Sequence, residues 1–206
     1  MKTMLEKFRD TTARKPSGWL GKRLYEDPKA HRESFRLILE KLDLKSDDSY
    51  LEVACGGGVL LEMALRTVSR GAAIDHSADM VELAMERNKA ALERGTAEVV
   101  EGNAESLPWP DESFSCAACA SAFFFFEHPE LVLSEISRVL EPNGRLVFTT
   151  CSGKTSLIGL LFKWPYNLKT YPDEKMERML YSAGFSVVEV DTVSGIQVWM
   201  AQKAES

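Results

Sequence analysis

Short apolar runs alternate with amphipathic segments along most of the chain. The runs are bounded by turn residues, a pattern typical of buried strands, and they predict strands at Leu51–Val53, Gly71–Asp75, Ala97–Glu101, Phe114–Ala120 and Arg145–Thr150. Between the runs, apolar residues recur at helical spacing. They predict helices at Phe35–Leu42, from Val59 to about Thr67, from Ser77 to about Arg94, from Pro129 to Leu140 and from Asp173 to Ala183.

The last two apolar runs, Phe185–Val190 and Ile196–Ala201, are separated by a short turn and predict an antiparallel hairpin. Strands that alternate with helices indicate an α/β fold. We therefore predict a doubly wound, mostly parallel seven-stranded sheet of Rossmann-like type, with helices on both faces and the hairpin at the C-terminus. The length of 206 residues suits a single domain, with residues 1–46 as a helical arm or lid and 47–206 as the ligand-binding core.

The chain is organised around a turn of small residues, Ala54–Gly58, between the first strand and the helix after it. Glycines allow positive φ and let a ligand approach the backbone closely. The helix that begins here presents free N–H groups and the positive end of its dipole, which suits an anionic group. The alternative interpretation is a tight strand-to-helix turn with no ligand.

Ligands of doubly wound sheets bind at the carboxyl ends of the strands. This rule is expected to bring four stretches together: the glycine turn, Asp75, the loop that begins at Gly102-Asn103, and the region around Ala120. The predicted turn at Glu141–Gly144 ends the helix that precedes the fifth strand.

These stretches, in this order, resemble the motifs of class I S-adenosylmethionine-dependent methyltransferases, and in particular the small-molecule branch that includes ubiquinone/menaquinone-biosynthesis enzymes. The resemblance covers residues 47–150 best. It rests on Leu-Glu-Val-Ala-Cys-Gly-Gly-Gly from Leu51, Ala-Ile-Asp-His-Ser-Ala-Asp-Met from Ala73, Gly-Asn-Ala-Glu-Ser-Leu-Pro-Trp-Pro-Asp from Gly102, and Ile-Ser-Arg-Val-Leu-Glu-Pro-Asn-Gly-Arg-Leu-Val from Ile136.

The resemblance implies S-adenosylmethionine as cofactor and a role for each of several residues. Asp75 would accept the ribose hydroxyls, and Glu52 would fix the ammonium of the methionyl part, directly or through water. Other implied cofactor contacts come from the turn (Ala54, Cys55, Gly56, Gly58), from the residues beside the adenine (His76, Met80, Asn103, Ala104, Glu105), and from Ala120. A place in the hydrophobic core, without contact to the cofactor, would explain Met80 equally well.

The sequence departs from the family pattern at two of these residues and at Ser115. Ala54 stands where a glycine is usual, Asn103 replaces an aspartate, and Ser115 replaces the aspartate that often follows the phenylalanine of the fourth strand. No general base is evident, and the catalytic residues are left unassigned. Methyl transfer depends largely on the alignment of the methyl group with the nucleophile, and some nucleophiles need little proton removal, so a methyltransferase can lack a general base.

The predicted activity is methyl transfer to a small-molecule acceptor. Phe123–Phe126 would wall a dry substrate pocket, although packing beneath the next helix explains half of this run equally well. A methyltransferase acting on protein or RNA is an alternative, and a non-catalytic cofactor-binding sensor or subunit is another.

Net charge, the N-terminal segment and the cysteines bear on the possible partners, location and metal content of the protein. The net charge of −6 argues against a nucleic-acid partner. The charged segment Met1–Asp10 is unlike a signal peptide, and no apolar run is long enough to span a membrane, so we expect a cytoplasmic protein. Cys116 and Cys119 form a C-x-x-C, but residues three apart on a strand face opposite sides, so no metal site is predicted.

Two segments contain more large apolar residues than exposed loops need: the arm around Trp19–Tyr25 and the connection Leu157–Tyr171. Both are expected at the carboxyl edge of the sheet. They are predicted to close over the cofactor and form part of the acceptor pocket, or alternatively to pack on the core or on a second subunit. The oligomeric state is not predicted.

Overall fold

The computed structural model describes residues 31–151, 169–193 and 196–205. The arm around Trp19–Tyr25 and nearly all of the connection Leu157–Tyr171 lie outside these ranges, so their predicted closure over the site stays a prediction. No helix within the described ranges is long and apolar enough to cross a membrane.

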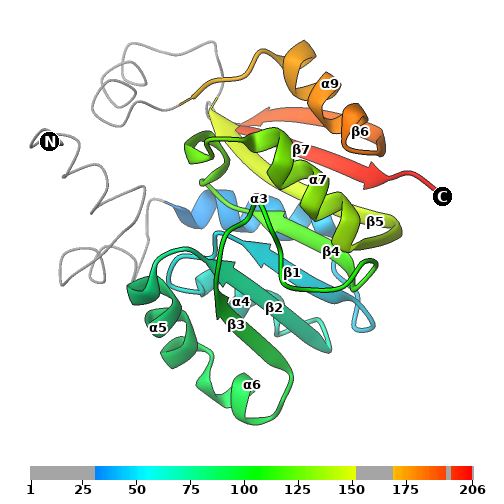
Figure 1. The fold of residues 1–206 in the computed structure, drawn as a ribbon. Helices are drawn as coiled ribbons and strands as arrows, with labels where there is room; N and C mark the ends of the chain where they lie inside the picture. The colour runs from blue at the N-terminus through cyan, green and yellow to red at the C-terminus, as the bar shows by residue number, and fades with distance from the viewer. Residues whose placement is uncertain (1–30, 152–168, 194–195, 206) are drawn as a thin grey trace, which may run out of the picture.

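A seven-stranded sheet in the order β3-β2-β1-β4-β5-β7-β6 forms the centre of the molecule (Figure 1). The strands are β1 (Ser49–Val53), β2 (Arg70–Asp75), β3 (Ala97–Glu101), β4 (Phe114–Cys119), β5 (Leu140–Cys151), β6 (Phe185–Val193) and β7 (Ile196–Lys203). The first five pair in parallel, and β7 lies antiparallel between β5 and β6. The predicted fold class is confirmed.

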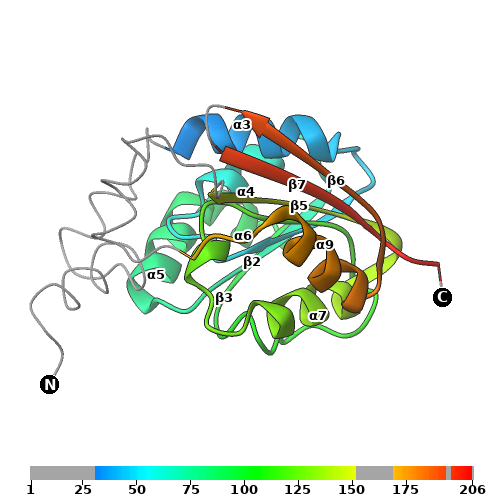
Figure 2. The same ribbon diagram turned by 90° about the horizontal axis from the view of Figure 1, so that it is seen from above.

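Helices cover both faces of the sheet (Figure 2). One face carries α3 (Arg32–Leu42), α4 (Val59–Ala64) and α5 (Ala78–Arg87), which α6 (Lys89–Glu93) follows; the other carries α7 (Pro129–Val139) and α9 (Asp173–Ser182). Each face has its own hydrophobic core. Cys116 lies in the core beneath α3 and α4, and Cys119 in the core beneath α7, so the two face opposite sides as predicted.

The central strands β1 and β4 are almost entirely buried because helices cover both faces. Every residue of β1 is buried, and β4 places small residues, Cys116–Cys119, in the middle of the sheet. The chain moves outward from β1 to β2 and β3, and then returns to β4 on the other side of β1. The carboxyl ends of β1 and β4 therefore form the switch point at which doubly wound sheets bind ligands.

The helix predicted from Ser77 to about Arg94 is divided at Asn88. The Asn88 side chain donates hydrogen bonds to the carbonyl oxygens of Ala84 (2.9 Å) and Gly58 (3.1 Å). A side chain that bonds the preceding turn competes with the helix backbone. α4 also ends at Ala64, three residues before the predicted end near Thr67.

The turn predicted at Glu141–Gly144 lies inside β5, which begins at Leu140 directly after α7. The pairing of β4 with β5 shifts from Phe114↔Leu140 to Cys116↔Arg145, so the four residues form an irregularity in a continuous strand. Asn143 takes up the left-handed conformation there, with φ of 63°. The prediction of a helix end was correct, and the prediction of a separate turn was wrong because the strand resumes pairing beyond it.

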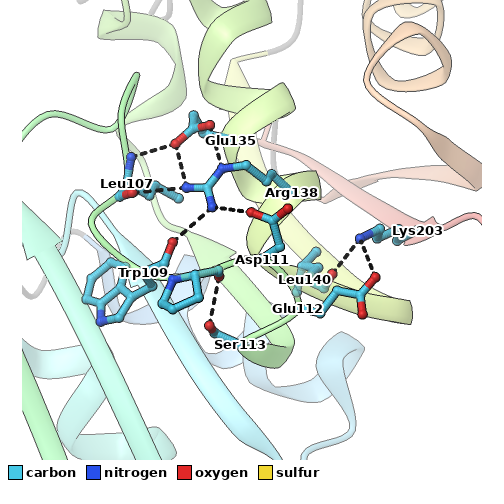
Figure 3. A network of polar contacts seen from close by, with 10 residues as sticks. Leu107, Trp109, Asp111, Glu112, Ser113, Glu135, Arg138, Leu140 and Lys203 are labelled. Atoms are coloured by element: carbon cyan, nitrogen blue, oxygen red, sulfur yellow. Dashed lines mark hydrogen bonds and ion pairs between the residues drawn. The ribbon is translucent and has the colours of Figure 1, made fainter.

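The long loop between β3 and β4 is attached to α7 mainly through the side chain of Arg138 (Figure 3). Its guanidinium donates to the carbonyl oxygens of Leu107 (3.0 Å) and Trp109 (2.9 Å) and pairs with the carboxylates of Glu135 and Asp111. Glu135 in turn accepts a hydrogen bond from the Leu107 backbone N–H at 2.7 Å. This network holds the loop whose first residues approach the site.

Replacing Arg138 by alanine is expected to lower the free energy of unfolding by about 2 kcal/mol, because several charge-assisted hydrogen bonds to the loop are lost together. Urea denaturation followed by circular dichroism measures the change. Arg66→Ala is the matched control: Arg66 is exposed and pairs only loosely with Glu62, at 3.7 Å, so its loss should cost less than about 0.5 kcal/mol. Equal effects of the two substitutions would contradict the role given to Arg138.

Candidate functional site

A cavity of about 390 Å³ lies at the carboxyl ends of β1, β2 and β4 and extends to the loop after β3. Most of the residues predicted for the site line it: Glu52, Ala54, Cys55, Gly56, Asp75, His76, Asn103, Ala104 and Ala120. Parallel strands deliver their carboxyl ends to one edge, which is why stretches far apart in the sequence meet here.

The small-residue turn after β1 has a left-handed backbone at three positions. Ala54, Gly56 and Gly58 have φ of 59°, 51° and 69°. Alanine pays about 1–2 kcal/mol for this conformation, whereas glycine adopts it freely. The Cys55 N–H donates to the Ile74 carbonyl oxygen at 3.1 Å, which fixes the turn against the end of β2.

Asp75 ends β2 with a buried carboxylate that accepts two backbone hydrogen bonds. Oδ2 accepts from the N–H of Gly56 and Oδ1 from the N–H of Ser77, both at 2.9 Å. The ring nitrogen Nδ1 of the half-exposed His76 lies 3.6 Å from Oδ1. Asp75 therefore shapes the glycine turn as well as lining the cavity, a double role that the sequence did not indicate.

Glu52 lines the same cavity from the interior of β1, and its carboxyl group is buried at 2% exposure. Its Oε2 atom has no hydrogen-bond partner among the described residues. Burial raises the pKa of Glu52 to about 8; repulsion from Asp75 adds to this, and a hydrogen bond from the Leu61 backbone opposes it. A buried carboxyl group without a counter-charge is suited to a cationic group of a ligand.

Three residues predicted for the site do not line the cavity. Met80 is fully buried and therefore serves as core. Glu105 lies in the loop, where its backbone N–H donates to Asn103 Oδ1 at 3.0 Å. Gly58 faces α5: a Cβ atom there would lie 2.8 Å from Ala84 Cβ and 2.8 Å from Asn88 Nδ2. Glycine is required at position 58 by helix packing and by its positive φ, and no ligand contact is needed to explain it.

The cavity also contains residues that the motifs did not indicate. His31 and Phe35 reach it from the start of α3, and Ser121, Ala122, Phe125, Phe126 and Glu127 from the segment after β4. The aromatic run was recognised in the sequence, and the structure divides it. Phe123 packs in the core, 4.6 Å from Phe148 between ring centroids, whereas Phe125 and Phe126 line the cavity. For His31 and Phe35, only the amphipathic pattern of α3 was visible in the sequence.

The charges around the cavity are unbalanced. Glu52, Asp75 and Glu127 contribute carboxyl groups, and no lysine or arginine is among the described residues that line it. Away from the backbone N–H groups of the glycine turn, which suit an anionic group, such a lining disfavours phosphate or carboxylate groups on a ligand and favours cationic or uncharged ones. The aromatic side chains lie toward the β4 end, whereas Asp75, His76 and Asn103 lie toward the β2 and β3 end.

Comparison with known proteins agrees with this architecture. A family profile described as a methyltransferase domain matches residues 51–148. The chain is 33% identical over 131 residues to the ubiquinone/menaquinone biosynthesis C-methyltransferase of Hahella chejuensis; the match covers 62% of this chain and 53% of that enzyme, about half its length. It is 27% identical over 197 residues to the enzyme of the same description from Francisella tularensis subsp. novicida, with coverages of 80% and 77%.

Among solved structures, the fold is similar to that of the cyclase SpnF, with a TM-score of 0.71 and 22% sequence identity. The superposition covers 93% of this chain and 85% of the other. At this level of identity the likeness concerns the fold alone.

The buried Glu52 carboxyl group makes stability depend on pH. Its pKa is raised from the ordinary value of 4.5 to about 8, so the folded chain holds a proton that the unfolded chain releases between these values. The free energy of unfolding is therefore expected to fall as pH rises from about 5 to about 8, by up to about 1.4 kcal/mol per pH unit. Glu52→Gln should flatten this slope, measured by urea denaturation across the range.

Glu40→Gln is the control, because Glu40 is exposed on α3; its curve should run parallel to that of the wild type. Parallel curves for Glu52→Gln and the wild type would show that Glu52 is not the group that makes stability fall.

Proposed function

Because this chain belongs to the class I S-adenosylmethionine-dependent methyltransferases, we propose that it transfers the methyl group of this cofactor to a small, uncharged aromatic acceptor. The observation that carries the proposal is the asymmetry of the cavity, which has Glu52, Asp75 and a glycine turn at one end and aromatic side chains at the other, with no lysine or arginine among the described residues that line it.

The residues at the β1–β3 side fit the cofactor. Oε2 of Glu52, buried without a described hydrogen-bond partner, suits the ammonium of the methionyl part. Asp75 suits the ribose hydroxyls, because a carboxylate oxygen that accepts one backbone hydrogen bond retains a lone pair for another donor. Asn103 and the Ala104 backbone would bond the adenine edge. When bound, the cofactor supplies an electrophilic methyl group on a sulfonium.

The residues at the β4 side favour an apolar, planar acceptor. Phe35, Phe125 and Phe126 offer aromatic surface, and an anionic acceptor would meet Glu127 with no described lysine or arginine to offset it. Both relatives described above are quinone-biosynthesis C-methyltransferases, which supports a hydroquinone or phenol as the acceptor class.

Two alternatives make different predictions. A protein or RNA substrate would need a recognition surface, and the net charge of −6 does not favour RNA. A non-catalytic cofactor-binding protein is compatible with the fold, since the same fold occurs in a protein described as a cyclase. Methyl transfer by the purified protein separates the alternatives.

Asp75→Ala is expected to weaken the binding of S-adenosylhomocysteine at least about tenfold, because hydrogen bonds to a charged group contribute about 1.5–3 kcal/mol each. Isothermal titration calorimetry provides the measurement. Glu101→Ala is the matched control: Glu101 is the β3 partner of Asp75 in the sheet register, but it is exposed and lies outside the cavity. An affinity in Asp75→Ala equal to that of the control would contradict the ribose assignment.

The wild-type protein is expected to transfer a radiolabelled methyl group to 1,4-naphthohydroquinone or to a simple phenol. It should do so far more efficiently than to phosphoethanolamine or a benzoate, whose anionic groups the cavity disfavours. Product extraction with scintillation counting measures each rate. Preferred methylation of an anionic acceptor would contradict the proposed acceptor class, and binding of S-adenosylhomocysteine without transfer to any probe would favour the non-catalytic alternative.

A further inference from the structure

We propose that His31 is the general base of the reaction and accepts the proton from a hydroxyl group of the acceptor as the new bond to the methyl carbon forms. The inference rests on the proposed function. It names the general base, which the sequence motifs left unassigned. It starts from the position of α3, which the resemblance to the family did not place at the site.

The start of α3 lies at the carboxyl edge of the sheet. Helix α3 crosses the face of the sheet that also carries α4, and it begins on the side toward which the arrowheads of β1 and β2 point (Figures 1 and 2). Ser34, one turn after His31, has its Oγ 3.5 Å from the Oγ of Ser121, which follows β4. The Ser121 backbone N–H in turn donates to Thr149 Oγ1 on β5, at 2.8 Å.

The order of the strands places His31 at the acceptor end of the cavity. From β3 to β4, the lining passes from Asn103 through Asp75 and the glycine turn to Ser121. The first three contribute to the proposed cofactor half. His31 lies beyond them, with Ser34 in contact with Ser121, and it shares the cavity with Phe125 and Phe126.

The other ionisable groups of the cavity are less suited to accept a proton from the acceptor. Glu52 faces the proposed ammonium, and Asp75 faces the proposed ribose hydroxyls at the same end of the cavity. Burial raises the pKa of the Cys55 thiol, which keeps it protonated. His76 lies beside Asp75 at the cofactor end, and Glu127 is exposed at the rim, where water solvates its charge.

The surroundings of His31 keep its imidazole neutral. The ring stacks on Phe35, with 6.1 Å between centroids and 29° between planes, and burial lowers the pKa of His31 below its ordinary value. A neutral imidazole has one nitrogen that can accept a hydrogen bond or a proton. At neutral pH the base is therefore present in the form that the reaction needs.

The proposed step balances without any further reagent. The oxygen–hydrogen bond of the acceptor breaks, and its proton passes to an imidazole nitrogen of His31. The electron pair released to the acceptor makes oxygen, or a ring carbon conjugated with it, the nucleophile that bonds to the methyl carbon. Where a ring carbon is methylated, that carbon then releases its own hydrogen as a proton to water and the oxygen takes a proton back, which restores the aromatic ring. The pair of the breaking carbon–sulfur bond stays on sulfur and cancels its positive charge, and the imidazolium then releases its proton to water.

The dependence of rate on pH follows from this step. Protonation of His31 should remove activity on the acidic side of the profile, with an apparent pKa below about 6.5. Among the described residues, the charged and titratable groups that share the cavity with His31 or lie in the first turn of α3 also enter this profile: Glu52, Cys55, Asp75, His76 and Glu127, and Arg32 and Glu33.

The test compares His31→Gln with His128→Gln, using 1,4-naphthohydroquinone and a nitrophenol as acceptors. Glutamine keeps polarity but cannot act as a base at neutral pH, so His31→Gln is expected to lower kcat with the hydroquinone about 100-fold and to lose the acidic limb. With 4-nitrophenol as the nitrophenol, which is already ionised at pH 8 and as an anion should react more slowly than the hydroquinone even with the wild type, the loss caused by His31→Gln should be less than about tenfold. His128 is exposed and outside the cavity, so His128→Gln should match the wild type.

Two readouts separate a chemical role from a structural one. S-adenosylhomocysteine should bind His31→Gln with an affinity within about threefold of the wild-type value by calorimetry. In the wild-type complex, NMR titration should give His31 a pKa below its ordinary value. An equal loss of kcat with both acceptors, or an unchanged acidic limb in His31→Gln, would overturn the role of His31 while leaving the methyltransferase function standing. Absence of transfer by the wild type to every acceptor would overturn the function itself.

Discussion

The site depends on the carboxylate of Asp75, which joins the ends of two neighbouring strands. It accepts backbone hydrogen bonds from Gly56 in the turn after β1 and from Ser77 at the start of α5. Neither N–H group lies in a strand, so neither finds a hydrogen-bond partner in the backbone of the sheet. A buried N–H without a partner costs about 1–3 kcal/mol. The geometry of the glycine turn and the direction in which α5 leaves the sheet therefore rest on a residue that also faces the cavity.

The proposed role in ligand binding would explain the position of Glu52, which stability does not. An apolar residue in the middle of β1 would suit the empty fold better, because a buried carboxyl group with an unpaired oxygen is costly. The cost falls when a cation enters the cavity, since the attraction then offsets the loss of hydration. We expect a destabilising residue beside a binding site where the free energy of ligand binding offsets its cost.

Sequence reasoning succeeded where pattern and position determine the outcome. The strand runs, the sheet class, the meeting of the glycine turn with Asp75 and Asn103, and the opposite faces of Cys116 and Cys119 all follow from periodicity and from parallel pairing. That the lining residues contact the cofactor stays a proposal.

Sequence reasoning failed where contacts between segments far apart in the chain determine the local structure. Gly58 is required by the approach of α5, and the break at Asn88 comes from a side chain that reaches Gly58. Residues 141–144 lie within a strand because β5 pairs with β4 on both sides of them. His31 left no signal in the sequence, since its place in the cavity depends on how α3 crosses the sheet.

The two turns that flank the switch point share an unusual backbone feature. Ala54 follows β1 and Ser121 follows closely on β4; both line the cavity, and both hold a left-handed conformation, with φ of 59° and 54°, that residues other than glycine seldom adopt. Each is held by hydrogen bonds in its neighbourhood, from Cys55 to Ile74 at the first turn and from Ser121 to Thr149 at the second. Strain of this kind persists only where the surroundings over-determine the backbone. Left-handed residues at both of these adjacent strand ends give rigid walls to the part of the cavity where the methyl group and the acceptor would have to meet. A reaction that depends on alignment benefits most from rigidity at that point.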